Sequence, residues 1–241
     1  MNENYNQNNT DTAVKRGFLS WLDNFWYHYK WHTIISLFLV FAITICTVQS
    51  CQKTSYDIRI MYAGSHTIKR QSEGADIPEY TKVLTALKAV TPDFDDNGKS
   101  DVALLDLHVL TNAEMQESDD YNATRVLSDR ETLTNNLGVS DYYLCFFSPS
   151  VYEEYKEGAG ELLFASLAPY VNDGSGLEYY DESAVYLSST GFYKLAGVSG
   201  FPEDTLICIR KINGVSSHFN SKNAKKQFSR AEDVLRNILN Y

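Results

Sequence analysis

The sequence predicts a membrane-anchored α/β (or α+β) protein, with one N-terminal transmembrane helix followed by a mixed four- to five-stranded sheet flanked by helices. Two observations support this fold class. An uncharged apolar run occupies residues 33–48, and strand-like apolar segments alternate with segments of helical periodicity in residues 57–241. The chain of 241 residues is long enough to bury a sizeable core, and its 22% of charged residues is too low for general disorder.

The apolar run reads TIISLFLVFAITICTV, and with its neighbours in 31–50 it reaches the length of about 20 residues that crosses a bilayer core. The preceding FWYHYKW surrounds Lys30 with aromatic rings, which the membrane–water boundary favours. Further upstream, five apolar residues fall at helical spacing and predict an amphipathic helix on the inner membrane face: Phe18, Trp21, Leu22, Phe25 and Tyr29.

The flanking charges predict the orientation of the span. Lys15, Arg16 and Lys30 precede it and a long acidic segment follows, so we expect a signal-anchor in the cell membrane, with a cytoplasmic N-terminus and residues 51–241 outside. Cleavage is the alternative, because Val48 and Ser50 suit a signal-peptidase site and VQSC, which ends at Cys51, is a loose lipobox. A leader of this length with aromatic residues is unlike a signal peptide, which favours the uncleaved anchor.

These features divide the chain into five parts. We expect a disordered tail (1–14), an interfacial helix (15–30), the transmembrane helix (31–50), a linker (51–56) and an extracytoplasmic domain (57–241).

The charge of the chain is concentrated in the middle of that domain. The formal net charge is −10, and residues 71–204 hold 25 acidic residues against seven basic ones. Such a surface repels phosphate backbones, so we expect no nucleic-acid partner.

Within the domain, apolar alternation predicts strands at 57–62, 102–110, 141–147 and 204–212, with an edge strand at 184–189. Helical periodicity predicts helices at 79–90 and 129–137, a helix that Ser150 and Glu153 open as a capping box, and a terminal helix from Ser221. The terminal helix has an apolar stripe of Ala224, Phe228, Ala231, Leu235 and Ile238, and residues 111–123 are expected to be a loop.

Cys145 and Cys208 lie inside two of the apolar strands, whereas Cys46 and Cys51 belong to the membrane segment and its outer end. If the two strands are neighbours, Cys145 and Cys208 either form a disulfide or remain buried thiols. The four cysteines match no zinc-binding spacing.

The segment DFDDNGKSD resembles a calcium-binding loop. Counted from its first residue, oxygen ligands fall at positions 1, 3, 5, 7 and 9, and Gly98 stands at position 6, where an EF-hand turns sharply. The predicted Ca²⁺ ligands are Asp93, Asp95, Asn97, the backbone carbonyl of Lys99, and Asp101. Position 12 is Leu104 rather than glutamate, so the loop is closer to the D-x-D-x-N-G core of extracellular repeat domains and dockerins. A solvated turn is the alternative.

Catalytic motifs are missing from the sequence. No histidine lies in H-E-x-x-H or beside a G-x-S-x-G elbow, and neither a Walker loop nor G-x-G-x-x-G occurs. We expect His108 to be a packed strand residue rather than a catalytic base, and the turn at 188–190 to cap a helix rather than to bind an anion. A group of tyrosines is expected either to pack in strands or to line a ligand groove: Tyr142, Tyr143, Tyr179, Tyr180, Tyr186 and Tyr193.

FWYHYKWH leading into a single span, followed by YDIRIMYAG, resembles uncharacterised single-pass membrane proteins of clostridial Gram-positive bacteria. The segments DVALLDL and SDYYLCFFSPSVYEEY, with LFASLAPYV after them, are similar to extracellular solute-binding proteins. The resemblance covers most of the chain. It departs from solute-binding proteins in size, because residues 57–241 are enough for one lobe and part of another and not for a two-lobed clamp. It carries no ligand residues over to this sequence.

We therefore expect a membrane-anchored extracytoplasmic binding or accessory module, non-enzymatic and calcium-stabilised. Its expected partners are the lipid bilayer and either a small ligand or a membrane protein. The alternative is a surface hydrolase that uses carboxylates not identifiable from the sequence. Inward signalling would need a further protein, because the cytoplasmic tail is too short to hold a catalytic domain.

Overall fold

The computed structural model of the chain describes residues 18–51, 55–68, 78–117, 122–139, 141–158, 160–172, 176–212 and 221–241. The tail predicted for residues 1–14 and residues 52–54 of the predicted linker lie outside the described residues. The chain forms two compact units, Met1–Thr54 and Ser55–Tyr241.

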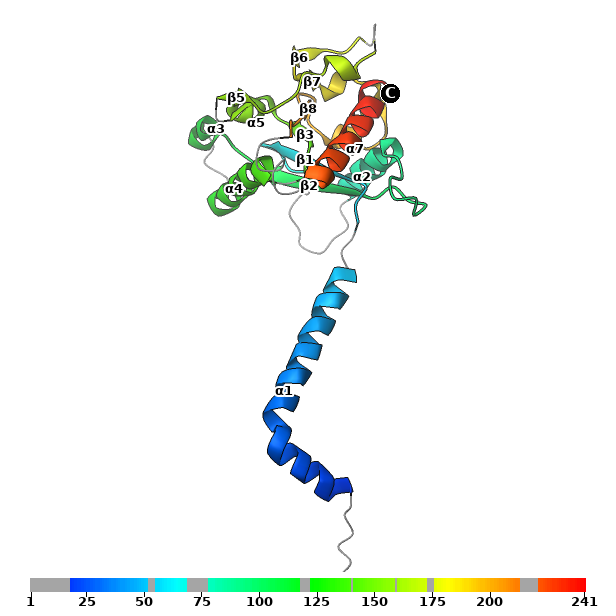
Figure 1. Cartoon of the computed structure of the whole chain (residues 1–241). Coiled ribbons are helices and arrows are strands. Elements are labelled where there is room, and N and C mark those ends of the chain that lie inside the picture. The colour runs from blue at the N-terminus through cyan, green and yellow to red at the C-terminus, as the bar shows by residue number, and fades with distance from the viewer. Residues whose placement is uncertain are drawn as a thin grey trace, which may run out of the picture. The chain divides into compact units, whose positions relative to one another are not determined.

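The first unit contains the helix α1 (Phe18–Cys51), which continues through the predicted interfacial segment into the predicted transmembrane segment. Within it, Asn24–Thr47 is long and apolar enough to span a membrane, and none of its most apolar window is buried. Trp21, Phe25 and Tyr29 stack along one side of the helix, with ring centroids 5.6 and 5.4 Å apart. Figure 1 shows that α1 bends in its N-terminal half.

The second unit is built on a mixed sheet with the strand order β2-β1-β3-β8-β7-β6. Strands β2, β1 and β3 are parallel to one another, and β8, β7 and β6 continue the sheet in antiparallel pairs. The bounds are β1 (Ile58–Gly64), β2 (Val102–His108), β3 (Leu144–Phe147), β6 (Tyr179–Asp181), β7 (Ala184–Tyr186) and β8 (Leu206–Ile209), and a separate hairpin joins β4 (Glu157–Gly158) to β5 (Glu161–Leu162).

The mixed α/β class is confirmed, but the prediction of four or five strands is wrong because the sheet has six. The additional strand is β6, whose three residues are exposed or half-buried and therefore show no apolar alternation. It forms because the chain reverses tightly before β7, where the Asp181 carboxylate accepts a 2.8 Å hydrogen bond from the backbone amide of Ser183. The expected edge strand, β7, consequently lies inside the sheet.

One face of the sheet packs against α2 (Pro78–Val90) and α7 (Ser221–Leu239), which lie near each other in Figure 1. Ile58, Ile60 and Tyr62 of β1 point to this face, as their alternation predicts. The predicted stripe of α7 packs into the same core, so the long terminal helix is confirmed. Four 3₁₀ turns complete the layer: η1 (Ala168–Tyr170), η2 (Leu187–Ser189), η3 (Gly191–Lys194) and η4 (Val198–Gly200).

The other face packs against α4 (Ala123–Val139) and α5 (Pro149–Tyr155). Met61, Cys145 and Phe147 point to this face, where they meet Leu133 of α4 and Tyr152 of α5. The sheet is therefore covered by helices on both sides, as its nearly continuous apolar strands require.

Three helix starts differ from their predictions. Helix α4 begins at Ala123 instead of the predicted Asp129, because Asn122 caps it by accepting a hydrogen bond from the Arg125 amide at 3.1 Å. The expected loop at 111–123 contains α3 (Asn112–Glu117), which Thr111 and Glu114 open as a capping box: the Thr111 amide donates to Glu114 Oε2 (2.7 Å), and the Glu114 amide donates to Thr111 Oγ1 (3.3 Å). Helix α5 is capped by Ser148, whose hydroxyl accepts a hydrogen bond from the Val151 amide. The expected cap, Ser150, lies inside α5, because Pro149, which follows Ser148, suits the first helical position.

Candidate metal centre

The loop between α2 and β2 is held by its own side chains. The Asp93 carboxylate accepts hydrogen bonds from the backbone amides of Gly98 (2.7 Å) and Asn97 (3.1 Å), and Asp95 Oδ1 accepts from Asn97 (3.3 Å). Asn97 Oδ1 in turn accepts from the amide of Lys99 (2.9 Å). The side chains of Asp93, Asp95 and Asn97 thus accept hydrogen bonds from backbone amides a few residues further on, as Asp and Asn do in turns.

Two residues of this loop adopt left-handed backbone conformations. Asp96 has a φ of 56° and Gly98 a φ of 83°. Asp tolerates this region and Gly enters it without steric cost, so the D-N-G order suits the loop. The sharp turn that the sequence predicts at Gly98 is therefore present.

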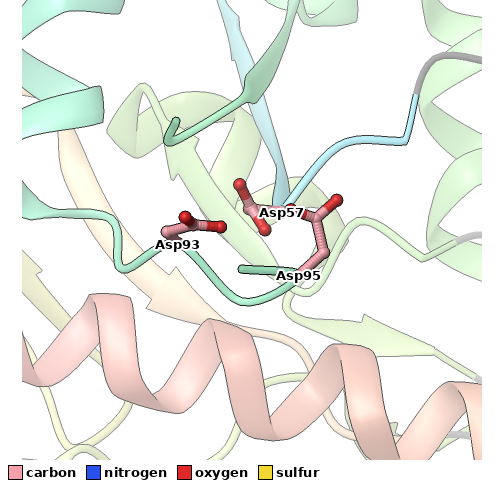
Figure 2. A group of neighbouring side chains, drawn as sticks. All are labelled: Asp57, Asp93 and Asp95. Atoms are coloured by element: carbon pink, nitrogen blue, oxygen red, sulfur yellow. The ribbon is translucent and has the colours of Figure 1, made fainter. Parts of the chain in front are cut away.

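A third carboxylate reaches the loop from the residue that precedes β1. Asp57, which is only 1% exposed, accepts hydrogen bonds from the backbone amides of Phe94 and Asp101, both at 2.9 Å. The Asp57 amide donates back to the Asp101 carbonyl at 2.8 Å. Figure 2 shows Asp57 gathered with Asp93 and Asp95, and one carboxylate oxygen from each lies within 4.8 Å of the others.

Arg230 of α7 fixes the backbone on the other side of this cluster. Its guanidinium donates to the carbonyls of Asp57 (3.0 Å), Phe94 (3.2 Å) and Tyr56 (3.4 Å), and it stacks over the Phe94 ring at 4.9 Å. Arg230 is buried, so these contacts join α7, β1 and the loop in the interior. The backbone that carries the carboxylates is therefore held both by the Asp57 side chain and by Arg230.

The hydrogen bonds also keep Asp93 charged. Desolvation raises the pKa of Asp93, but the amides of Gly98 and Asn97 stabilise the carboxylate and outweigh it, so the pKa lies below its usual value. Asp93 is therefore an anion at neutral pH, close to two further carboxylates.

The structure gathers only part of the predicted ligand set. Asp93 and Asp95 belong to the cluster, and Asn97 and Lys99 lie on the same loop. The Asp101 carboxylate is outside the cluster and lies 4.0 Å from the ammonium of Lys88. Leu104, at the twelfth position, is buried in β2.

Sequence reasoning missed Asp57, which lies 36 residues before Asp93. Its position just before β1 held the only available signal, because β1 and β2 are parallel neighbours and their amino ends lie side by side. The donor set of carboxylate and amide oxygens suits a hard cation such as Ca²⁺ or Mg²⁺. In such a site Asp57 would supply an oxygen from outside the loop, where an EF-hand would use its last residue.

The other residues singled out in the sequence do not form a catalytic group among the described residues. His108 lies in β2, and its backbone amide donates to Asp129 of α4 at 2.9 Å. Thr190 caps η3 by accepting from the Tyr193 amide. Tyr180 contacts the rings of Tyr152 and Tyr186 edge-on, which indicates packing rather than a ligand groove.

A groove of about 500 Å³ lies elsewhere, between the end of α4 and the β4–β5 hairpin. Its lining is mainly apolar, with Leu162 half exposed at its wall and Tyr155 beside it. Its lining residues are Thr134, Leu137, Gly138, Tyr155, Glu157, Gly158, Glu161, Leu162, Leu163, Lys211 and Ile212. A mainly apolar groove with a few polar groups has the composition of a binding site.

In comparisons with known proteins, no family model, curated protein or solved structure matches the chain.

The left-handed turn predicts opposite effects for two glycine substitutions. Gly98→Ala should destabilise the domain by about 1 kcal/mol, because alanine is strained at positive φ although a Cβ meets nothing within 4 Å. Gly138→Ala, inside α4 and equally open, should stabilise it by roughly 0.5–1 kcal/mol. Urea unfolding of residues 55–241 measures both. Equal signs for the two variants would contradict the turn geometry.

Proposed function

We propose that this chain is a single-pass membrane protein whose unit Ser55–Tyr241 is an extracytoplasmic, non-enzymatic binding or accessory module stabilised by calcium. The observation that supports it most is the division of the chain into an apolar helix of spanning length and a separate compact unit. A helix that exposes its apolar side chains is stable in a bilayer, where lipid covers them.

The side chains of α1 support the membrane part of the proposal. Trp26, Tyr29 and Trp31 are exposed around Lys30, whereas the apolar side chains of the span, such as Leu37 and Phe41, are exposed beyond it. This order is that of an interfacial aromatic belt followed by a hydrocarbon-spanning segment. The bases on the N-terminal side favour a cytoplasmic N-terminus.

The groove between α4 and the β4–β5 hairpin supports the binding part. It offers apolar walls at Leu137, Leu163 and Ile212 and exposed charges at its rim. Such a site binds a partially apolar ligand or an apolar side chain of a membrane partner. Recognition is therefore assigned to this groove.

The calcium part is supported by the cluster of Asp57, Asp93 and Asp95. Three carboxylates within 4.8 Å repel one another, and a divalent cation removes that repulsion while it joins β1 to the loop. Extracellular calcium modules work at roughly 10⁻⁴–10⁻³ M, so the ion would be bound outside the cell and not in the cytoplasm.

Protease added to intact cells tests the orientation. We expect it to remove a tag fused after Tyr241 and to leave a tag before Met1 intact, because only the C-terminal unit is outside. Permeabilised cells, in which both tags should be lost, provide the control. Protection of the C-terminal tag in intact cells would contradict the proposed topology.

Calcium in the millimolar range should raise the melting temperature of residues 55–241. At a hundredfold excess over Kd, the stabilisation is about 2.7 kcal/mol. Asp93→Asn combined with Asp95→Asn should abolish the shift, because two charged ligands are lost. Asp96→Asn is the matched control, since Asp96 lies in the same loop outside the cluster and asparagine tolerates its positive φ. An equal shift in all three proteins would disprove the site.

A photoreactive amino acid at position 162 tests the groove in living cells. Leu162 is 50% exposed within the groove, and Leu127, on α4 outside it, is 60% exposed and serves as the control position. We expect light-dependent adducts to form from position 162 and not from position 127. Equal adduct formation at both positions, or none at 162 together with turnover of a hydrolase substrate, would contradict the binding proposal.

A further inference from the structure

The two core cysteines of the domain lie directly opposite each other. Cys145 of β3 pairs with Cys208 of β8 in the antiparallel register, and both side chains are fully buried. They belong to the same core cluster, on the sheet face that α4 and α5 cover. The sequence alone does not decide whether the two cysteines pair, because residues separated by 63 positions meet only if β3 and β8 are neighbours.

Both thiols are free in the structure, and the spacing of their Cα atoms is that of bridged cysteines. The Arg210 amide donates to the Tyr143 carbonyl at 2.8 Å, so Tyr143 and Arg210 are a hydrogen-bonded pair of the ladder. Cys145 lies two residues after Tyr143, and Cys208 lies two residues before Arg210. They are therefore also a hydrogen-bonded pair, in which the Cα atoms are about 5.5 Å apart. That spacing falls within the range of about 4.4–6.8 Å found for disulfides. The Cβ atoms of a hydrogen-bonded pair lie about 5.5 Å apart, whereas a disulfide holds them at roughly 3.5–4.5 Å, so β3 and β8 must draw together when the bond closes. Cys208 Sγ already lies 3.7 Å from the Cys145 carbonyl oxygen.

We infer that Cys145 and Cys208 close to an intramolecular disulfide in an oxidising compartment. The inference rests on the proposed extracytoplasmic location for the supply of an oxidant, which is a small-molecule disulfide or the disulfide of a protein oxidant. One cysteine thiolate attacks a sulfur of that disulfide, forms a mixed disulfide and releases one thiol. The second cysteine then attacks the protein sulfur and releases the other thiol, so two cysteine thiols are oxidised and one disulfide is reduced.

Burial decides when this reaction takes place. Burial raises the pKa of the Cys208 thiol, and the thiolate is the attacking species. Both sulfurs are also closed to solvent in the folded sheet. Oxidation therefore occurs while the domain folds or while β3 and β8 separate transiently, and the finished disulfide is protected from reductants by the same burial.

The position of the two cysteines in the sheet explains how a disulfide between them would stabilise the domain. Strands β3 and β8 form the boundary at which the parallel part of the sheet meets the antiparallel part. A bond at this boundary closes a long loop of the chain and thus restricts the unfolded state more than the folded one. The oxidised protein should resist heat and denaturant better than the reduced protein.

The experiment uses the full chain in detergent micelles with Cys46→Ser and Cys51→Ser, so that only the two core cysteines remain. The protein is unfolded in urea under reducing conditions and refolded with either reduced or oxidised glutathione. We expect oxidised glutathione to give a chain that lacks two hydrogens by intact mass, a linked peptide pair that contains Cys145 and Cys208, and a higher melting temperature. Adding Cys145→Ala should remove all three differences between the two refolding conditions.

Two free thiols after refolding with oxidised glutathione, or disulfides formed only between chains, would overturn the inference. A thiol-blocking reagent added to lysing cells separates this inference from the proposed location. A disulfide that forms in vitro while both thiols remain free in cells would contradict the extracytoplasmic location and leave the pairing intact.

Discussion

Asp57 places a carboxylate in the interior of the domain where β1 begins, and burying a charge is unfavourable unless polar groups meet it. The amides of Phe94 and Asp101 meet it directly, which holds the loop between α2 and β2 against the start of β1. Arg230 then binds the carbonyls of the same segments from α7. The first strand, the acidic loop and the terminal helix are therefore joined around one buried charge.

The same hydrogen bonds hold the backbone of the acidic loop against β1 and α7. Asp93 and Asp95 bring further negative charge next to Asp57, while the hydrogen bonds to Asp93 keep its pKa low and its carboxylate ionised. The backbone contacts hold the three carboxylates together against their repulsion. The calcium ion that we propose for this cluster would remove that repulsion and so would stabilise the domain.

Much of the fold could be predicted, because its central elements carry strong local patterns. The alternation of Ile58, Ile60 and Tyr62 and the stripe of α7 identified a strand and a helix with their buried faces. The short elements could not be predicted from apolar periodicity: β6 exists through its pairing with β7, and α3 begins with the capping box of Thr111 and Glu114. In the site, spacing within the loop found Asp93 and Asp95, but Asp57 belongs to the cluster only through the parallel pairing of β1 with β2.

Hydrogen exchange at the amides of Phe94 and Asp101 tests the role of Asp57 most directly. Because both amides donate to a buried carboxylate, we expect them to exchange as slowly as the Val109 amide, which donates to the Gly64 carbonyl in the sheet. In Asp57→Asn only one side-chain oxygen remains as an acceptor, so at least one of the two amides should lose protection while Val109 keeps it. Exchange of Phe94 and Asp101 at the rate of exposed amides in the unmodified protein would contradict the account.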